Sequence, residues 1–292
     1  MIVTPVGFST AIAAASAGDV ISLSAGDYAG TLVRNLTFDP PVVLDCSAAT
    51  LTGWKLRFVK GLTFRDANFR TLGTGDALRA EDCERLAFEG GTATGPEVAG
   101  EGVLGVRADG RGLVFTRCQG VKITSCAFSG LAVGVAFSLT QDFAVTDSSF
   151  DRMRSDGIVV GNSQRGALLR NVHQGSTPLG SEHPDAVQLL SKDTYPVTAD
   201  IEISDCQISG RTQGVCGFGV RFERITIARN WLWTTYAQGI ALYGVNRAVV
   251  TDNRVRCFAG GAGRPTINLR GENIVRKGNV IEGAFGRPAV VD

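Results

Sequence analysis

The chain has 292 residues, so one or two domains are expected at about 150 residues each. Apolar residues make up 44% and charged residues 20%, which excludes a disordered chain. The formal net charge is +1, so no overall field is expected to attract nucleic acid. No apolar run approaches the ~20 residues that insert into a bilayer as a helix. Seven cysteines without a C-x-x-C pair, and only two histidines, predict no metal site.

The first predicted element is a short amphipathic helix within residues 1–19. Its apolar stretch, Phe8–Ala17, lacks the preceding basic residues of a secretion signal, so no signal peptide is predicted. Gly18 and Asp19 end this segment, and the strand-like sequence VISL follows. We therefore expect residues 1–19 to form an N-terminal cap on the rest of the chain.

An eight-residue block recurs along the remaining sequence. Its copies begin at Leu62, Leu86, Val121, Phe143, Ala167, Ile201, Ile225, Ala248 and Ile274, and six of the eight intervals are 22 to 26 residues long. The first, third and eighth positions are mostly apolar, as in a strand with one buried face. A second short strand precedes most blocks and starts at Asp76, Gly134, Gly157, Asp185, Gly219, Gly239 and Thr266. This pattern predicts a parallel β-helix of about ten to eleven coils over residues 20–292.

Stacking of the coils brings equal block positions above one another. The sixth position holds Ala67, Gly91, Cys126, Ser148, Val172, Cys206, Asn230, Asn253 and Asn279. An asparagine at a turn can hydrogen-bond its backbone and its equivalents in neighbouring coils. We therefore expect an asparagine ladder at one corner, with cysteines as small buried members.

The repeat, together with the opening AAASAGDVISLSAGDYAG, resembles the pectate-lyase-like superfamily over essentially the whole chain. The resemblance implies an all-β fold, namely a single-stranded right-handed parallel β-helix (solenoid) with a short N-terminal capping helix. It also implies a function directed at polysaccharides, because the members include lyases, polygalacturonases, epimerases and phage tailspikes. The D-P-H-E motif of alginate epimerases and the aspartate trio of polygalacturonases are absent, so the resemblance selects no particular reaction.

Two long intervals interrupt the repeat, and insertions in repeat proteins become loops on one face. The first interval carries an insertion at residues 92–102. The second carries residues 175–184 before the strand that starts at Asp185 and residues 191–198 after it. Because both of these loops flank one strand, we expect them to wall a ligand groove.

Carboxylates are predicted on the outer face of that same coil. The register puts Asp76, Asp156, Asp185 and Gln238 in one outward column. Coils stack ~4.8 Å apart, so Asp156 and Asp185 should be neighbours. Adjacent carboxylates can shift each other's pKa and supply one acid and one base; alternatively they cap turns or pair with arginines.

The segment SEHPDAVQ also brings Glu182 and His183 close to Asp185 in the sequence. A histidine beside carboxylates can act as a general acid or base near neutral pH, although loop histidines also serve as plain surface hydrogen-bonding groups. The candidate catalytic residues are therefore Asp185, His183, Asp156 and Glu182.

Candidate substrate-binding residues form two groups. A second outward column is predicted to hold Arg79, Arg107, Gln188 and Arg221, where arginines can bind carboxylates bidentately. Tyr195, in the loop 191–198, is added to this group.

The second group consists of Trp231 and Trp233, which flank the inward Leu232 and should point outward. Outward indoles stack on sugars or anchor a protein interface; a third alternative is burial under a loop.

Three functions remain open. The first is a polysaccharide-recognising and, in an active form, polysaccharide-degrading module of the phage tail fibre or tailspike type, located in the virion tail, homotrimeric and in contact with other tail proteins. The second is an extracellular bacterial uronate-polysaccharide lyase, hydrolase or epimerase. The third is a non-catalytic structural or carbohydrate-binding solenoid. No D-x-D-x-D-G loop occurs, so no cofactor is predicted, although acidic side chains on a β-helix face can bind Ca²⁺.

Overall fold

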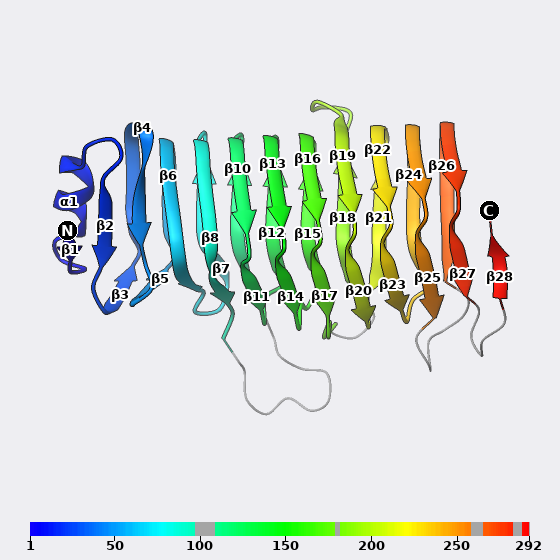
Figure 1. The fold of residues 1–292 in the computed structure, drawn as a ribbon, viewed down its shortest axis with the longest axis horizontal. Helices are drawn as coiled ribbons and strands as arrows, with labels where there is room; N and C mark the ends of the chain where they lie inside the picture. Colours follow the sequence, from blue (N-terminus) through cyan, green and yellow to red (C-terminus); the bar gives the residue numbers. More distant parts are fainter. Residues whose placement is uncertain (97–108, 179–181, 258–264, 283–287, 292) are drawn as a thin grey trace.

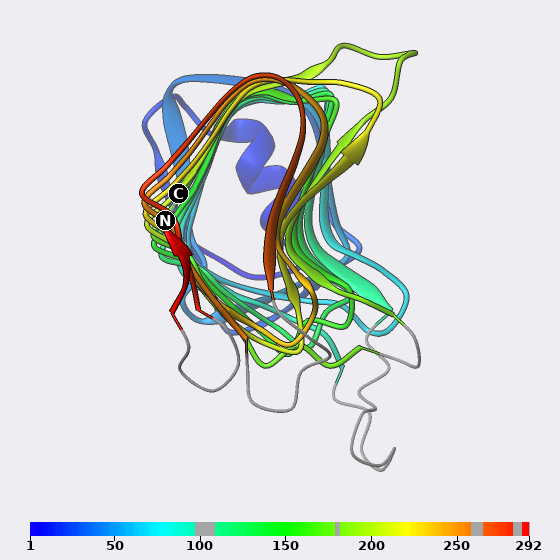
Figure 2. The same cartoon turned by 90° about the vertical axis from the view of Figure 1, so that its right-hand side faces the viewer.

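The computed structural model describes residues 1–96, 109–178, 182–257, 265–282 and 288–291. Almost all of its strands pair in parallel and wind into a β-helix of about eleven coils, as the repeat predicted (Figure 1). Viewed along the axis, the successive coils overlay as one ring (Figure 2), and its interior is filled by buried apolar side chains. Each coil passes in turn along three faces, which we call face I, face II and face III.

Each face is a stack of strands that pair with the coils before and after them. Face I contains the first parts of β4 (Leu32–Asp45) and β6 (Trp54–Arg70), then β7 (Gly75–Glu81), β9 (Gly110–Thr116), β12 (Val133–Ser138), β15 (Asp156–Gly161), β18 (Asp185–Ser191) and β21 (Gln213–Gly219), and the first parts of β24 (Gln238–Thr251) and β26 (Thr266–Lys277). Face II contains β1 (Ile2–Val3), β2 (Val20–Leu23), later parts of β4, β6, β24 and β26, the first part of β8 (Glu84–Thr94), β10 (Gln119–Thr124), β13 (Gln141–Thr146), β16 (Gln164–Leu169), β19 (Thr198–Ser204) and β22 (Phe222–Ala228). Face III contains β3 (Gly26–Ala29), β5 (Ala49–Thr52), the ends of β6 and β8, β11 (Ala127–Ser129), β14 (Ser149–Asp151), β17 (Val172–Gln174), β20 (Gln207–Gly210), β23 (Trp231–Thr234), β25 (Arg254–Cys257) and β27 (Val280–Glu282), against which β28 (Pro288–Val291) runs antiparallel.

The helix α1 (Phe8–Ala14) lies across the N-terminal mouth of the solenoid (Figure 2). The ring of Phe8 packs against Trp54 at 5.1 Å and against Tyr28 at 6.0 Å between ring centroids. The helix therefore covers the apolar edge of the first coil, which would otherwise be open. In the described part of the chain no helix is long and apolar enough to cross a membrane.

The interior is built from equal positions of successive coils. One inward column of face I consists of residues that are each 5% exposed or less: Leu78, Leu113, Val135, Ile158, Val187, Val215, Ile240 and Ile267. On face III, Phe150 stacks on Phe128 at 4.8 Å and on His173 at 4.5 Å. Burial lowers the pKa of His173 to about 3, so this histidine is a neutral member of the core.

The predicted asparagine ladder lies at the corner between faces II and III. Asn253 Oδ1 accepts the backbone N–H of Asn230 at 3.0 Å, and Asn279 Oδ1 accepts that of Asn253 at 3.1 Å. Asn171 Oδ1 accepts the backbone N–H of Ser148 at 3.1 Å, so Asn171 is a member of the ladder, and the assignment of Val172 was one residue late. Val172 instead begins β17 on face III.

Other corners carry aspartates and arginines with left-handed backbone, φ between 53° and 57° at Asp142, Arg165, Asp200 and Arg224. Each arginine pairs with the aspartate of the preceding coil, as in Arg165–Asp142, Arg170–Asp147, Arg224–Asp200 and Arg229–Asp205. These pairs are largely exposed, so each contributes only ~0–1 kcal/mol. They account for many of the acidic residues without any catalytic role.

Candidate functional site

Asp156 and Asp185 are the first residues of β15 and β18, two neighbouring strands of face I. The backbone N–H of Asp185 donates to Asp156 Oδ1 at 3.0 Å, and Ser155 Oγ donates to Asp156 Oδ2 at 3.1 Å. The predicted adjacency of the two carboxylates is therefore present in the structure. Neither forms an ion pair with an arginine among the pairs seen in the described residues, which distinguishes both from the corner aspartates.

The Asp185 side chain lies on the outer side of the sheet but is covered, with 1% of its surface exposed. Gln188 Nε2 donates to Asp185 Oδ2 at 3.1 Å, whereas Asp185 Oδ1 has no hydrogen-bond partner among the described residues. On the next coil, the Cys216 thiol lies beside the carboxylate and donates to Gln213 Oε1 at 3.0 Å. Among the described residues, one buried carboxylate oxygen of Asp185 therefore lacks a hydrogen-bond donor. Such a group lowers the stability of the fold, so a functional role is a reason for its presence.

The surroundings of Asp156 and Asp185 raise the pKa of both carboxyl groups. Burial, and secondarily the charge of Asp156, raise the pKa of Asp185 to about 7. Burial also raises the pKa of Asp156, although the hydrogen bond from the Asp185 backbone opposes that change. Near neutral pH, the pair can therefore hold one proton between its two carboxyl groups, which is the state needed for one acid and one base.

The other two candidate catalytic residues belong to the loop before β18. Glu182 accepts a hydrogen bond from Tyr236 Oη at its backbone oxygen (2.9 Å), and its carboxylate is 3.6 Å from Arg154 Nε. His183 is exposed, and a positive charge on it would lower the pKa of both aspartates. Glu182 is therefore engaged structurally, whereas His183 remains accessible at the edge of the pair. The predicted loops 92–102 and 175–184 extend into residues 97–108 and 179–181, which lie outside the described residues.

A groove of about 530 Å³ lies on the same face, N-terminal to the second insertion. Its floor consists of the small outward side chains Val114, Ala136 and Val159, and Tyr195 contributes to its wall. Tyr195 is 53% exposed and belongs to the segment between β18 and β19. Asp156, Asp185 and Gln188 are not among the residues that line this groove.

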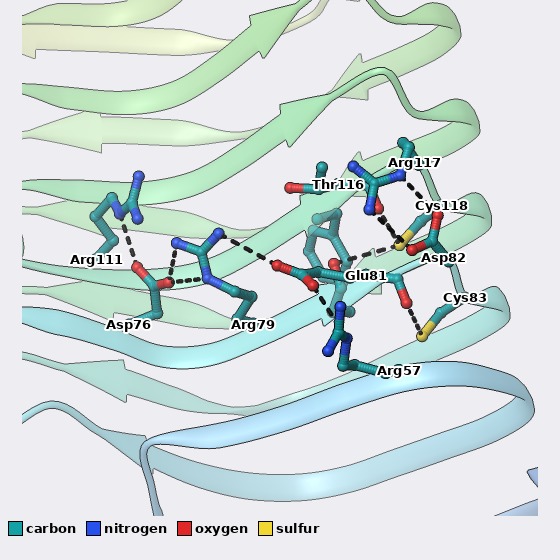
Figure 3. Close-up of polar contacts among 12 residues, drawn as sticks. Arg57, Asp76, Arg79, Glu81, Asp82, Cys83, Arg111, Thr116, Arg117 and Cys118 are labelled. Carbon is teal, nitrogen blue, oxygen red and sulfur yellow. Dashed lines mark hydrogen bonds and ion pairs between the residues drawn. The ribbon is translucent and has the colours of Figure 1, made fainter. Parts of the chain in front are cut away.

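The groove is lined by basic side chains and by no acidic ones: Arg79, Arg111, Arg117 and Lys192. Asp76 bridges Arg79 and Arg111, with 2.7 Å from the Nε of each arginine to the Asp76 carboxylate (Figure 3). Asp82 pairs with Arg117 in the same view. Arg79 also pairs with Glu81 at 3.7 Å, so three carboxylates face the four basic side chains of the groove, and the small positive balance that is left favours an anionic ligand.

Two predicted substrate-binding arginines are not where the sequence alignment put them. The position beside Gln188 on the next coil is Cys216, because the strand of that coil is β21 and not a strand starting at Gly219. Arg221 follows β21 and binds Glu223 instead, at 2.9 Å from Nε, which lowers the pKa of Glu223 to about 2. Arg107 lies outside the described residues, and Val114 occupies the position next to Arg79.

The spacing to the next block could have found the missed residues Arg111, Gln213 and Cys216. In four of the correctly assigned coils, the inward residue lies eight or nine positions before the block, as Leu78, Val135, Ile158 and Ile240 do. Val215 and Leu113 satisfy this spacing approximately, whereas Val220 and Val106 do not. The repeated Gly-Val dipeptides made both registers look equally good.

Trp231 and Trp233 both lie on the outer side of face III, with the buried Leu232 between them as predicted. They are therefore on a different face from the aspartate pair. Among the described residues, no group of three His, Cys, Asp or Glu side chains is arranged to hold a metal ion. Binding of Ca²⁺ stays a prediction.

No protein-family model and no curated protein matches the chain. Solved structures do match. The surface adhesin PfbA of Streptococcus pneumoniae aligns with a TM-score of 0.60 and 11% identity, covering 100% of this chain and 84% of that one. DFA-IIIase from Arthrobacter chlorophenolicus A6 gives 0.59 and 12%, covering 93% and 70%, and the A-module of the Azotobacter vinelandii mannuronan C-5 epimerase AlgE6 gives 0.50 and 13%, covering 94% of both chains. At these identities the similarity shows the fold alone, which is a parallel β-helix.

Proposed function

We propose that the protein binds an acidic polysaccharide outside the cell in the face I groove and hydrolyses it at Asp156 and Asp185. The observation that carries the proposal is the buried aspartate pair, with its raised pKa values, on the same face of the solenoid as a groove lined by basic side chains. An extracellular location is supported by fold neighbours that include a surface adhesin and an enzyme named for its action on mannuronan.

In this proposal, Asp185 is the general acid and Asp156 the general base. A carboxyl group with a pKa near 7 is still largely protonated at slightly acidic pH and can donate to the glycosidic oxygen as the bond breaks. Asp156, which is the more accessible at 8% exposure, would activate the attacking water. The glycosidic oxygen would take the place of the Gln188 amide at Asp185, so the Gln188 side chain would have to move aside.

The direct test is digestion of a panel of acidic and neutral polysaccharides with the purified protein, followed by mass spectrometry. We expect oligosaccharides from an acidic polymer, each carrying one added water per cleavage. Products with an unsaturated uronate, which absorbs near the ultraviolet edge, would assign elimination instead of hydrolysis. Failure to cleave any polymer would contradict catalysis and leave carbohydrate binding as the function.

A tail fibre or tailspike role is a finer form of this proposal, and it requires side-by-side packing of three copies. Face II offers a flat surface, because its central outward column consists mostly of small side chains: Ala87, Lys122, Ala144, Ala167, Glu202, Thr226, Val249 and Val275. Val249 and Val275 are 38% and 52% exposed, which is unusual for apolar residues in a row. We expect a trimer in sedimentation velocity at micromolar concentration, and a monomer would contradict the tail fibre role.

A further inference from the structure

The Trp231–Trp233 pair forms a rigid aromatic platform on face III. Trp231 is 39% exposed, and the two rings have centroids 6.0 Å apart with planes tilted by 46°. Trp233 is held from two sides, because its Nε1 donates to the Cys257 backbone oxygen at 3.2 Å and the Arg256 guanidinium lies 5.4 Å from its ring centroid. The platform is therefore preorganised, and a ligand that stacks on it would lose little side-chain entropy on the protein side.

The surroundings of the platform are polar. Gln207 and Ser209 lie opposite the two tryptophans on the preceding coil, and Arg254 and Arg256 on the following coil. Within the described residues, no other large apolar side chain of face III is exposed. Protein interfaces are usually centred on a contiguous apolar patch, which is missing around these two indoles. An indole face rimmed by amide, hydroxyl and guanidinium groups matches a sugar ring, which has apolar C–H faces and hydroxyls at its edge.

The same face continues toward the N-terminus as a strip of mostly small, hydrogen-bonding side chains. Its outward residues on successive coils include Thr92, Thr94, Ser129, Ser149, Gln174, Gln207 and Ser209. The charged residue within this stretch, Asp151, is paired with Arg152 at 3.1 Å. The Arg152 guanidinium also donates to Ser129 Oγ at 2.9 Å, so a chain that runs along the axis would pass over this guanidinium.

The strip ends in a second hollow, of about 470 Å³. It is lined by the polar side chains of Thr50, Asn68, Arg70, Thr94, Ser129 and Arg152 and by two glycines. Asn68 links the coils before and after it, since its Nδ2 donates to Thr50 Oγ1 at 3.4 Å and its Oδ1 accepts from Thr92 Oγ1 at 3.0 Å. The coil of Thr94 is five strands from that of Trp233 on this face, which is ~24 Å at the usual strand spacing.

We propose that face III is a second polysaccharide-binding surface, separate from the aspartate site, on which one glycan strand lies along the solenoid axis between the Trp231–Trp233 platform and the hollow at Asn68. Stacking on Trp231 supplies most of the affinity, and the hydroxyl and amide side chains of the strip bind the sugar hydroxyls. The surface retains polymer whether or not Asp185 catalyses cleavage.

Affinity electrophoresis of the full chain in gels containing alginate, polygalacturonate, dextran or xyloglucan tests the proposal. We expect at least one polymer to retard the wild-type protein. Trp231→Ala should weaken that binding at least tenfold, and Trp231→Tyr should weaken it less than alanine does. Asn68→Ala should weaken it about threefold. Phe58→Ala is the matched control, because Phe58 is an aromatic residue that is 56% exposed at a corner remote from face III, and it should bind as the wild type does. Circular dichroism of each variant verifies the fold.

The failures of the two proposals are distinguishable. Asp185→Asn should lose turnover but keep polymer retardation, whereas Trp231→Ala should lose polymer retardation. Retardation by no polymer, or retardation unchanged in Trp231→Ala, would overturn the face III proposal. So would a change of Trp231→Ala from oligomer to monomer in sedimentation, which would identify the face as a protein interface.

Discussion

Asp185→Asn is expected to abolish turnover and, in the same variant, to raise thermal stability above neutral pH. Asparagine cannot donate the proton that the glycosidic oxygen needs, so kcat should fall by several orders of magnitude. The amide keeps the shape of the side chain and can still accept the hydrogen bond from Gln188. An alanine would instead leave a cavity at a buried position, so asparagine is the cleaner test.

The stability effect follows from the raised pKa of Asp185. In the folded protein this pKa is about 7, whereas the ordinary value is 3.8. The folded state therefore binds the proton more tightly than the unfolded state, so this contribution to stability is complete below about pH 4 and is lost as the pH rises through 7. The amide introduced by Asp185→Asn does not titrate, so the wild type should fall behind the variant by a few kcal/mol between pH 4 and pH 8.

Thermal unfolding of both proteins across that pH range measures the effect. Asp147→Asn is the control, because Asp147 is exposed and its hydrogen bond with Arg170 lowers its pKa, so its small contribution is lost toward low pH instead. Asp76 would be a poor control, since it holds both Arg79 and Arg111. A melting-temperature difference between the Asp185 variant and the wild type that is the same at pH 4 and pH 8, or an active variant, would contradict the assignment.

Asn253→Ala is expected to be the most destabilising single change in the asparagine ladder. Asn253 is 1% exposed; it accepts the backbone N–H and the side-chain amide of Asn230, both at 3.0 Å, and donates to the Ile227 oxygen and Asn279 Oδ1, both at 2.9 Å. Alanine leaves several buried polar groups unsatisfied, each costing ~1–3 kcal/mol. We expect a loss of at least about 3 kcal/mol in the free energy of unfolding, measured by urea denaturation.

Asn68→Ala provides the comparison, because Asn68 also bridges two coils but is exposed to water. Water can replace its hydrogen bonds, so the loss should stay below about 1 kcal/mol. Equal losses in the two variants would mean that the ladder contributes no more than an ordinary surface hydrogen bond.

The repeat alone predicted the solenoid and the adjacency of Asp156 and Asp185. A period of 22 to 26 residues puts each position above its equivalent, so one-dimensional spacing becomes a three-dimensional contact. The same logic failed where the spacing was ambiguous. Gly214-Val215 and Gly219-Val220 both fit a strand start by local sequence, and the structure selects the first, with Val215 paired to Val187.

What the sequence by itself determined is therefore the stacking order of the coils, because that order depends on periodicity and on which side chains are apolar. What only the tertiary structure decided is the environment of each outward residue. The burial of Asp185 beneath Gln188 and beside Cys216 and the sharing of Asp76 by two arginines depend on contacts between coils and loops far apart in the sequence. Such contacts set solvent exposure and local charge, and these two quantities make Asp185 a candidate acid and its equivalent Asp76 a partner of two arginines.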